Sequence, residues 1–259
     1  MKYYRRPNNK AEYKQYDSRW GKLLYPAKPS TVGSSGCGLC AVTHCVIEQA
    51  KYYDCTPKDF YTFMKQYAVK GHGTEWRGID AGLKKYGLKN VKRFDSMSAF
   101  WKELEKGNRV GVLLFNNKKS PNGTQWTSGG HYVCFRGYRT SNDGKTHYLC
   151  TVDSGGRGHT GWYSYEKSMK GCLKLLWVAE VPKETIKLPE RGYFKRGDKG
   201  ESVKIIQAFL KKEGYYKGKV KGNYLSLTEQ AVKDWQKANS LKVDGLWGKE
   251  SNKKYEELT

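Results

Sequence analysis

A short polar stretch with two prolines, late in the chain, is the feature that most limits how this sequence can fold. Residues 182–192 contain Pro182 and Pro189 with charged residues between them, and they follow a strand-like run at 173–181. Proline lacks an amide hydrogen and disfavours helix in the residue before it, so this stretch indicates a linker. The 259 residues are therefore expected to form a larger domain, 1–181, and a smaller one, 193–259.

Positive charge is spread over both parts. The chain has 48 Lys and Arg against 25 Asp and Glu, a net charge of +23, and residues 188–259 alone contain 16 basic and 10 acidic side chains. Such a balance favours a polyanionic partner, which could be nucleic acid, an anionic membrane or a bacterial wall with anionic polymers. It is equally compatible with a well-solvated cationic surface that has no single partner.

Hydropathy argues against a membrane protein. The mean hydropathy is −0.83, no run of about 18 apolar residues occurs, and residues 1–10 contain no apolar segment. We therefore expect synthesis without a Sec-type signal and no membrane span. The seven cysteines are odd in number, which favours free thiols over a disulfide framework.

The C-terminal part contains a degenerate repeat. Helical spacing at 203–210 ends at Gly214, and a second amphipathic segment covers 228–238. A glycine-bearing turn follows each segment, at 222–224 and at 244–248. Two such units are too few for a solenoid and indicate a small helical module.

These residues resemble the peptidoglycan-binding type 1 domain, a three-helix module of cell-wall hydrolases. The resemblance covers about 195–258 and implies that Tyr224 and Trp247 contact the wall ligand. Lys221 and Leu225 depart from the family pattern in the first turn. The pattern is carried by Arg196-Gly197-Asp198-Lys199-Gly200, Val203, Gln207, Leu210, Gly214-Tyr215-Tyr216, Thr228, Ala231-Val232, Trp235-Gln236 and Val243-Asp244-Gly245-Leu246-Trp247-Gly248.

A candidate nucleophile stands at the start of a predicted helix in the larger part. Cys37 lies between Gly36 and Gly38, and the following residues can be helical. The free N–H groups of a helix N-terminus favour the thiolate, and small neighbours leave room for a substrate carbonyl. Three other roles stay open for Cys37: a redox CxxC motif with Cys40, a zinc site with Cys40 and His44, and a buried thiol without chemistry.

The base for this nucleophile is predicted from a hairpin. His131 follows a glycine-rich loop that ends in Gly130 and enters a strand, and a second strand runs over 147–153. If the turn is centred between residues 142 and 143, His131 lies opposite Asp153 or Ser154. A carboxylate in that place would hold the imidazole tautomer and stabilise the imidazolium. Asp153 could instead only cap the turn that follows it.

Two further residues are candidates for the wall of a substrate cleft. The loop 71–76 contains His72 between glycines and ends in Trp76, so it combines flexibility with an aromatic side chain. We expect His72, Trp76, Gly36 and Gly130 to contact substrate. The other histidines fit packing or surface roles, although His159 could also line the cleft.

The ordered set of Cys, His and Asp resembles papain-fold cysteine peptidases, more narrowly the peptidase C39-like group, over about 12–181. The resemblance implies an α+β fold with N-terminal helices, the nucleophile at a helix start, and an antiparallel sheet that carries His and Asp. It implies Cys37 as nucleophile, His131 as base and acid, Asp153 as orienting residue and Gln15 as an oxyanion donor. Asp153 is followed by Ser154 where the family often has proline. The motifs are Gln15-Tyr16-Asp17-Ser18-Arg19-Trp20-Gly21, Ser35-Gly36-Cys37-Gly38, Gly130-His131-Tyr132-Val133 and Val152-Asp153-Ser154.

Together the two resemblances imply a phage endolysin, a bacteriolytic enzyme that hydrolyses amide bonds in peptidoglycan. We expect a monomer that needs no metal or cofactor, is made in the host bacterial cytoplasm, binds peptidoglycan and anionic wall polymers, and does not bind nucleic acid. Endopeptidase activity on peptide cross-links is preferred over N-acetylmuramoyl-L-alanine amidase activity. Alternatives of other classes are a noncatalytic polyanion-binding protein and a cysteine protease that acts on proteins.

Overall fold

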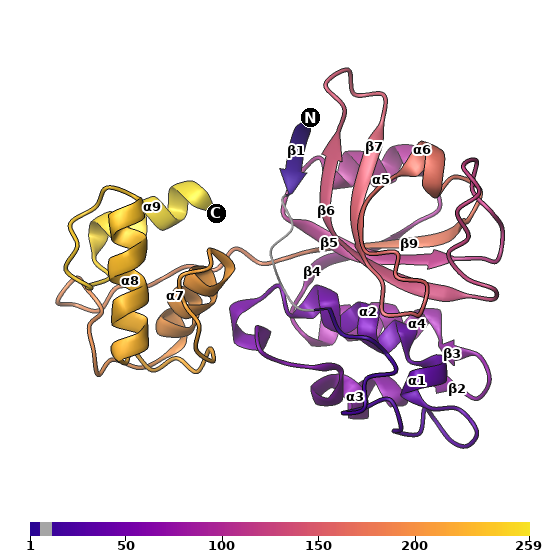
Figure 1. Ribbon diagram of the computed structural model, residues 1–259, viewed down its shortest axis with the longest axis horizontal. Helices are drawn as coiled ribbons and strands as arrows, with labels where there is room; N and C mark the ends of the chain where they lie inside the picture. The colour runs from indigo at the N-terminus through magenta and orange to yellow at the C-terminus, as the bar shows by residue number, and fades with distance from the viewer. Residues whose placement is uncertain (6–11) are drawn as a thin grey trace. The chain divides into compact units, whose positions relative to one another are not determined.

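The chain divides into two compact units. A computed structural model describes residues 1–5 and 12–259, so part of the N-terminal stretch considered for a signal lies outside it. The first unit comprises 1–48 and 55–182, and the second comprises 49–54 and 183–259 (Figure 1).

The first unit contains a seven-stranded antiparallel sheet with helices on both faces (Figure 1). The strand order is β4-β9-β5-β6-β7-β8, with β1 paired to β6, and β2 and β3 form a separate ribbon. The described strands are β1 Lys2–Arg5, β2 Ala68–Val69, β3 Gly73–Thr74, β4 Lys89–Phe94, β5 Arg109–Phe115, β6 His131–Thr140, β7 His147–Val152, β8 Gly161–Ser164 and β9 Leu173–Glu180. The helices are α1 Val32–Ser35, α2 Cys37–Val46, α3 Pro57–Lys65, α4 Trp76–Lys85, α5 Met97–Leu104 and α6 Tyr165–Ser168.

Helix α2 is the centre of one layer. All of its residues after Cys37 are buried, because small and apolar side chains let it lie against β5 and β6 on one side and α3 and α4 on the other. On the opposite face of the sheet, Phe100 and Trp101 of α5 pack into an aromatic cluster with Phe135 and Tyr138 of β6. The α+β class expected from the sequence is confirmed, and β6 lies between the two layers.

The hairpin of β6 and β7 has a different register from the expected one. Thr140 pairs with His147, so the turn is centred one residue later than we predicted, and an irregularity between Phe135 and Gly137 shifts the ladder again. The last ladder pair on the site side is Cys134 with Val152. His131 and Asp153 lie beyond this pair at the same end of the hairpin, which brings the two side chains together despite the shift.

The second unit is helical. Its helices are α7 Glu201–Lys212, α8 Ser226–Ala238 and α9 Lys249–Leu258, preceded in the chain by the short 3-10 turn η1 Ala50–Tyr52. The indole rings of Trp235 and Trp247 stack 5.0 Å apart at the centre, with Phe209 and Tyr255 against them edge-on. These aromatic side chains make a core that a domain of this size can bury.

Residues 49–54 correct the expected domain boundary. We assigned them to the larger domain, but Ala50 and Tyr53 lie in the core cluster of the second unit. The Asp54 carboxylate contacts Lys211 Nζ at 2.9 Å and accepts a hydrogen bond from Val220 N at 2.6 Å. The physical reason is that apolar and acidic side chains of this loop find partners in α7 and the turn after it. Nothing in the local sequence indicates that pairing.

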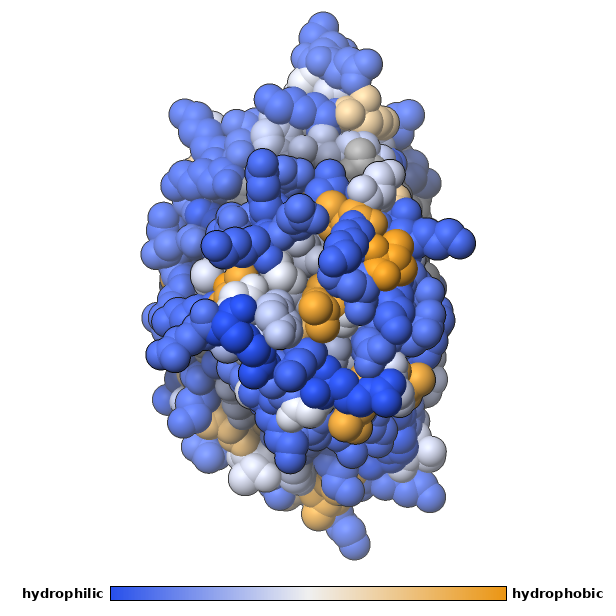
Figure 2. All heavy atoms as spheres, turned by 90° about the vertical axis from the view of Figure 1, so that its left-hand side faces the viewer, coloured by the Kyte–Doolittle hydropathy of each residue, from blue (hydrophilic) through white to orange (hydrophobic). Residues whose placement is uncertain are grey.

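One face of the molecule is largely hydrophilic. On the face that Figure 2 displays, hydrophobic residues form small separate groups among charged and polar side chains. Within the described parts of the chain, no helix is both long enough and apolar enough to cross a bilayer.

Candidate active site

Cys37 is the first residue of α2, and the glycines beside it have packing roles. A Cβ on Gly36 would come within 2.6 Å of Val32, and one on Gly38 would come within 2.4 Å of Thr74. The two glycines thus let α1 and β3 approach the start of α2 closely. This holds the Cys37 thiol, which is partly exposed, at a fixed place beside the sheet.

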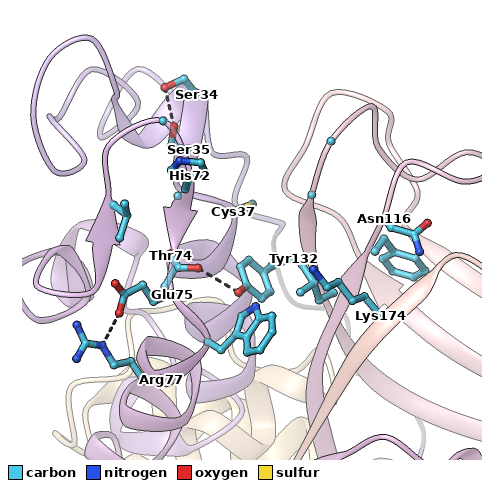
Figure 3. A pocket seen from close by; sticks show the side chains of 18 residues that line it. Ser34, Ser35, Cys37, His72, Thr74, Glu75, Arg77, Asn116, Tyr132 and Lys174 are labelled. Carbon is cyan, nitrogen blue, oxygen red and sulfur yellow. Dashed lines mark hydrogen bonds and ion pairs between the residues drawn. The ribbon is translucent and has the colours of Figure 1, made fainter.

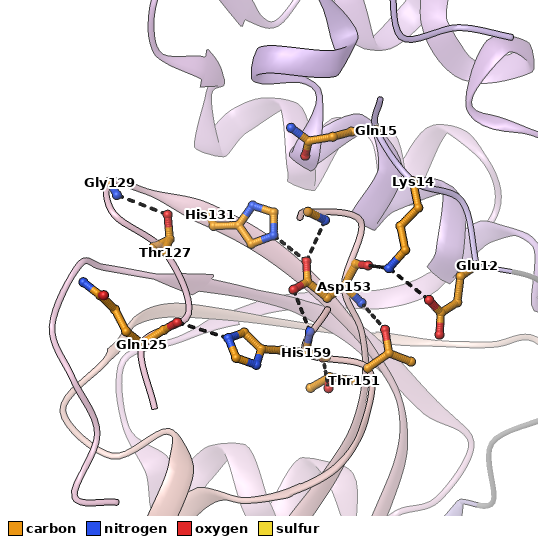
Figure 4. Close-up of polar contacts among 12 residues, drawn as sticks. Glu12, Lys14, Gln15, Gln125, Thr127, Gly129, His131, Thr151, Asp153 and His159 are labelled. Carbon is orange, nitrogen blue, oxygen red and sulfur yellow. Dashed lines mark hydrogen bonds and ion pairs between the residues drawn. The ribbon is translucent and has the colours of Figure 1, made fainter. Parts of the chain in front are cut away.

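His131 and Asp153 form a hydrogen-bonded pair at the entrance of the hairpin. His131 Nε2 lies 2.7 Å from Asp153 Oδ1, and the carboxylate is fully buried (Figure 4). The same carboxylate accepts hydrogen bonds from Gly155 N at 2.7 Å and His159 N at 3.0 Å. These three donors fix the carboxylate, and the pair leaves His131 Nδ1 as the ring atom available to Cys37. The contact expected from the hairpin is therefore present.

The charges of the three residues support one another. Burial alone would raise the pKa of the Cys37 thiol, but hydrogen bonding to His131 and its charge outweigh burial and lower the pKa. Burial opposes the charge of His131 as well, yet its contacts with Asp153 and Cys37 raise its pKa to about 10. Hydrogen bonding to His131 overcomes the burial of Asp153 and lowers the pKa of that carboxyl to about 2. These interactions therefore favour the charged forms of all three groups: a thiolate, an imidazolium and a carboxylate.

Gln15 spans the two segments that carry the site. Its backbone N donates to the Ser154 carbonyl at 3.0 Å, and its side-chain Nε2 donates to the Gly33 carbonyl at 2.8 Å. The side chain therefore lies between the residue after Asp153 and the segment that leads to Cys37 (Figure 4). Its Oε1 is buried without a hydrogen-bond partner. One N–H of the amide is not used by the bond to Gly33.

A cavity of about 780 Å³ opens beside the thiol (Figure 3). Cys37, His72, Trp76 and Gly130 line it, as expected for a substrate cleft, whereas Gly36 does not. A side chain on Gly130 would meet no atom within 4 Å, so the cavity is open there. The lining also includes Arg77, Asn116, Tyr132 and Lys174, which the sequence does not assign to the cleft, because nothing in their spacing marks them.

The alternative roles for the N-terminal cysteines find little support in the arrangement. His44 Nε2 accepts a hydrogen bond from Tyr13 N at 2.9 Å, and burial lowers the pKa of His44 to about 3. Burial also raises the pKa of Cys40. Among the described residues, no three His, Cys, Asp or Glu side chains gather as a metal site would require, and all seven cysteines are free thiols. His159, a second candidate for the cleft, holds Asp153 through its backbone N.

Tyr224 and Trp247 in the second unit do not form a ligand surface. We expected both to contact the wall, but both side chains are completely buried, and the Tyr224 hydroxyl donates to the Gly245 carbonyl at 2.8 Å. Both are large aromatic residues, and a small domain needs such side chains to fill its core. Their buried position follows from this need.

The two turns of the repeat are held by equivalent glutamines. Gln207 Oε1 accepts from Gly222 N at 2.9 Å and its Nε2 donates to the Asn223 carbonyl at 2.8 Å. In the second turn, Gln236 Oε1 accepts from Gly245 N at 3.0 Å and its Nε2 donates to the Leu246 carbonyl at 2.9 Å. Both glycines have φ near +75°, a conformation that favours glycine, so the sequence pattern encodes the turn itself.

A second cavity, of about 300 Å³, lies at the second turn of this unit. Gly248, Tyr193 and Asp244 are among its lining residues. The residue that corresponds to Gly248 in the first turn is Leu225, whose side chain is exposed. A side chain at 248 would point toward Tyr193, 3.7 Å from its Cβ, and would occupy this space.

Comparison with known proteins identifies the second unit. Residues 199–253 match the family described as "Putative peptidoglycan binding domain", so this unit contains a domain of that family, as its sequence pattern predicts. The match does not extend to the first unit.

Two solved structures are similar to parts of the chain. The N-terminal domain of SleB is 34% identical, with 26% of this chain and 90% of that chain covered and a TM-score of 0.25. A periplasmic domain of the EpsAB fusion protein of the Vibrio vulnificus type II secretion system is 14% identical, with coverages of 64% and 61% and a TM-score of 0.24. No curated protein sequence matches the chain.

Proposed function

We propose that this chain, whose second unit contains a domain of the peptidoglycan binding family, is a cysteine hydrolase that cuts amide bonds in bacterial peptidoglycan. The observation that carries the proposal is the hydrogen-bonded pair of His131 and the buried Asp153 beside Cys37, whose thiol pKa His131 lowers, at the edge of a large cavity. We also propose a papain-like, C39-like fold for the first unit. This assignment is supported by a helix that begins at Cys37 and packs on an antiparallel sheet, at whose end His131 and Asp153 lie.

The acylation step would use the thiolate of Cys37. Sγ attacks the amide carbonyl carbon, a C–S bond forms, and the carbonyl electrons move to oxygen. The negative oxygen would accept hydrogen bonds from the Cys37 backbone N–H and the unused N–H of Gln15. When the C–N bond breaks, His131 gives its Nδ1 proton to the departing amine, which leaves a thioester on Cys37.

Deacylation would reverse the roles. Neutral His131 takes a proton from a water molecule, the hydroxide oxygen bonds to the thioester carbon, and the C–S bond breaks to give a carboxylic acid and the thiolate. Asp153 keeps one tautomer of His131 throughout and stabilises its charged form. Because the aspartate is buried and bonded to two backbone N–H groups, it can hold the ring in place without moving.

The second unit would hold the enzyme on its insoluble substrate. We propose that the cavity at Gly248, not the aromatic core, takes the wall ligand. The net charge of +23 adds nonspecific attraction to anionic wall polymers, and tethering raises the concentration of the catalytic unit at the wall. We propose that the chain is a phage endolysin that is made in a bacterial cytoplasm and acts after release, with endopeptidase activity on peptide cross-links preferred over amidase activity.

The test uses purified, insoluble peptidoglycan. The parent chain should clear the suspension and release new amino termini, iodoacetamide should stop it, and EDTA should not. Cys37→Ser should remain bound to sedimented walls without clearing them. Clearing by Cys37→Ser at the parental rate would contradict the proposal. Salt-sensitive wall binding by a parent chain that releases no termini would favour the noncatalytic polyanion-binding alternative.

A further inference from the structure

One lysine in the wall of the active-site cavity has no ion-pair partner. Glu75 and Arg77 form an ion pair with each other (Figure 3), and in the proposed function the Cys37 thiolate is paired with the His131 imidazolium. Lys174 remains, on β9, and no carboxylate in the described part of the chain forms an ion pair with it. Its side chain extends from the sheet toward the cavity (Figure 3). The cavity wall therefore contains an ammonium group that no carboxylate of the described residues contacts.

An exposed aromatic ring lies beside this ammonium group. Trp76 is 45% exposed although it is a large apolar residue at the first position of α4. Lys174 Nζ lies 5.5 Å from the centre of its ring, and the guanidinium carbon of Arg93 lies 6.0 Å from it. The two cations come from the neighbouring strands β9 and β4. The arrangement is a half-covered indole flanked by two positive groups.

This corner has the chemistry of an anion-binding subsite. The indole removes water from one side of Lys174, which strengthens the attraction between its charge and a bound anion. The cation–π contact with the ring also restricts the conformation of the Lys174 side chain before a ligand binds. Less side-chain entropy is therefore lost on binding. Tyr132 supplies no second anion site, because its hydroxyl donates to the Thr74 carbonyl at 3.0 Å.

We propose that Lys174, held against Trp76, binds a carboxylate of the substrate, so that the chain cuts amides in acidic peptides that carry a free carboxylate. The inference rests on the proposed function, because it names the substrate class of that same cavity. Lys174 is a specificity-determining residue here and takes no part in bond breaking. Conversion of the carboxylate to a carboxamide removes the charge and keeps the shape, which gives a matched pair of substrates.

The experiment compares muropeptide dimers, prepared from purified peptidoglycan, as free acids and after amidation of their carboxylates. For the parent chain, KM should be about fivefold lower for the free acids, as expected for one partly exposed ion pair. Lys174→Gln should remove this difference by raising KM for the acids alone, with kcat unchanged. Lys170→Gln removes an exposed lysine of the same unit that does not line the cavity, and should retain the difference.

Two outcomes separate the inference from the function on which it rests. If cleavage depends on Cys37 but Lys174→Gln keeps the parental preference, or changes KM equally for both substrates, the carboxylate subsite is wrong and the hydrolase proposal stands. If the parent cleaves neither form, or Cys37→Ala cleaves both, the hydrolase proposal itself fails and the inference falls with it.

Discussion

The two units place their most recognisable residues in opposite environments. In the first, Cys37 borders a cavity and contacts His131, so the distinctive residues of the sequence are those available for chemistry. In the second, Tyr224 and Trp247 are completely buried, and the side chain of Gln236 forms hydrogen bonds with the backbone of the turn at 244–248. The sequence pattern of the second unit thus reflects how its core and turns are built, whereas the Cys, His and Asp pattern of the first unit marks a candidate active site.

The largest expected effect follows from replacing the nucleophile. Cys37→Ala should lower peptidoglycan hydrolysis by on the order of a thousandfold or more, because no other group can form the thioester. The melting temperature should stay near the parental value, since the thiol is partly exposed and its loss opens no sealed core. Thermal unfolding and release of new termini measure the two effects. A large fall in melting temperature would instead make Cys37 a structural residue.

Next in size is the replacement of the orienting carboxylate. Asp153→Asn should reduce turnover by roughly 10² to 10⁴-fold, because the imidazolium loses its partner. Since Asp153 contributes to raising the pKa of His131 to about 10, its removal lowers that pKa. His131 then loses its proton at a lower pH than in the parent. Because the imidazolium stabilises the thiolate, the pKa of Cys37 rises and the thiolate forms only at higher pH.

Alkylation of Cys37 by iodoacetamide, followed by mass spectrometry across pH, measures this shift. The rate profile of Asp153→Asn should move to higher pH relative to the parent, with Asp143→Asn in the exposed turn as the control. An unchanged profile together with unchanged turnover would assign the orienting role to another group.

Opening the core of the second unit tests the structural half of the comparison. Trp247→Ala should destabilise that unit by about 3–5 kcal/mol, because it removes a fully buried indole stacked on Trp235. Hydrolysis of soluble muropeptides should stay near parental, since the site lies in the first unit. Denaturant unfolding followed by tryptophan fluorescence measures the loss. If Trp247→Ala keeps the parental stability but fails to bind walls, Trp247 contacts the ligand and is not a core residue.

The smallest expected effect concerns the cavity of the second turn. Gly248→Leu copies Leu225 of the first turn and should fill the cavity, which should weaken sedimentation with walls by about tenfold, or about 1.4 kcal/mol. Leu225→Gly is the control and should bind as the parent does. Equal losses in both variants would mean that the ligand does not distinguish the two turns.

Local patterns were enough to predict several features. The division near residue 182, the amphipathic helices of the second unit and the contact of His131 with Asp153 follow from proline placement, hydrophobic spacing and hairpin geometry. The α+β class was implied by the resemblance to papain-fold peptidases. The hairpin contact was predicted from a turn one residue out of place, and the bulge between Phe135 and Gly137, which shifts the register again, has no sequence signal.

Other features depend on partners that are distant in the sequence. Residues 49–54 join the second unit through Lys211 and Val220, more than 150 positions away. Lys174 enters the cavity because β9 runs next to β5 in the sheet, which no spacing rule reveals. Burial of Trp247 also could not be inferred from its type, because tryptophan suits both a core and a ligand platform.

The most direct test of the central claim is mass spectrometry of purified peptidoglycan after digestion by the full chain, with Cys37→Ala as the control. We expect new paired amino and carboxyl termini at one kind of amide bond, absent with Cys37→Ala, and a transient mass increase on Cys37 that equals the acyl fragment. Cuts in the glycan strands, or amide cuts that persist in Cys37→Ala, would contradict that claim.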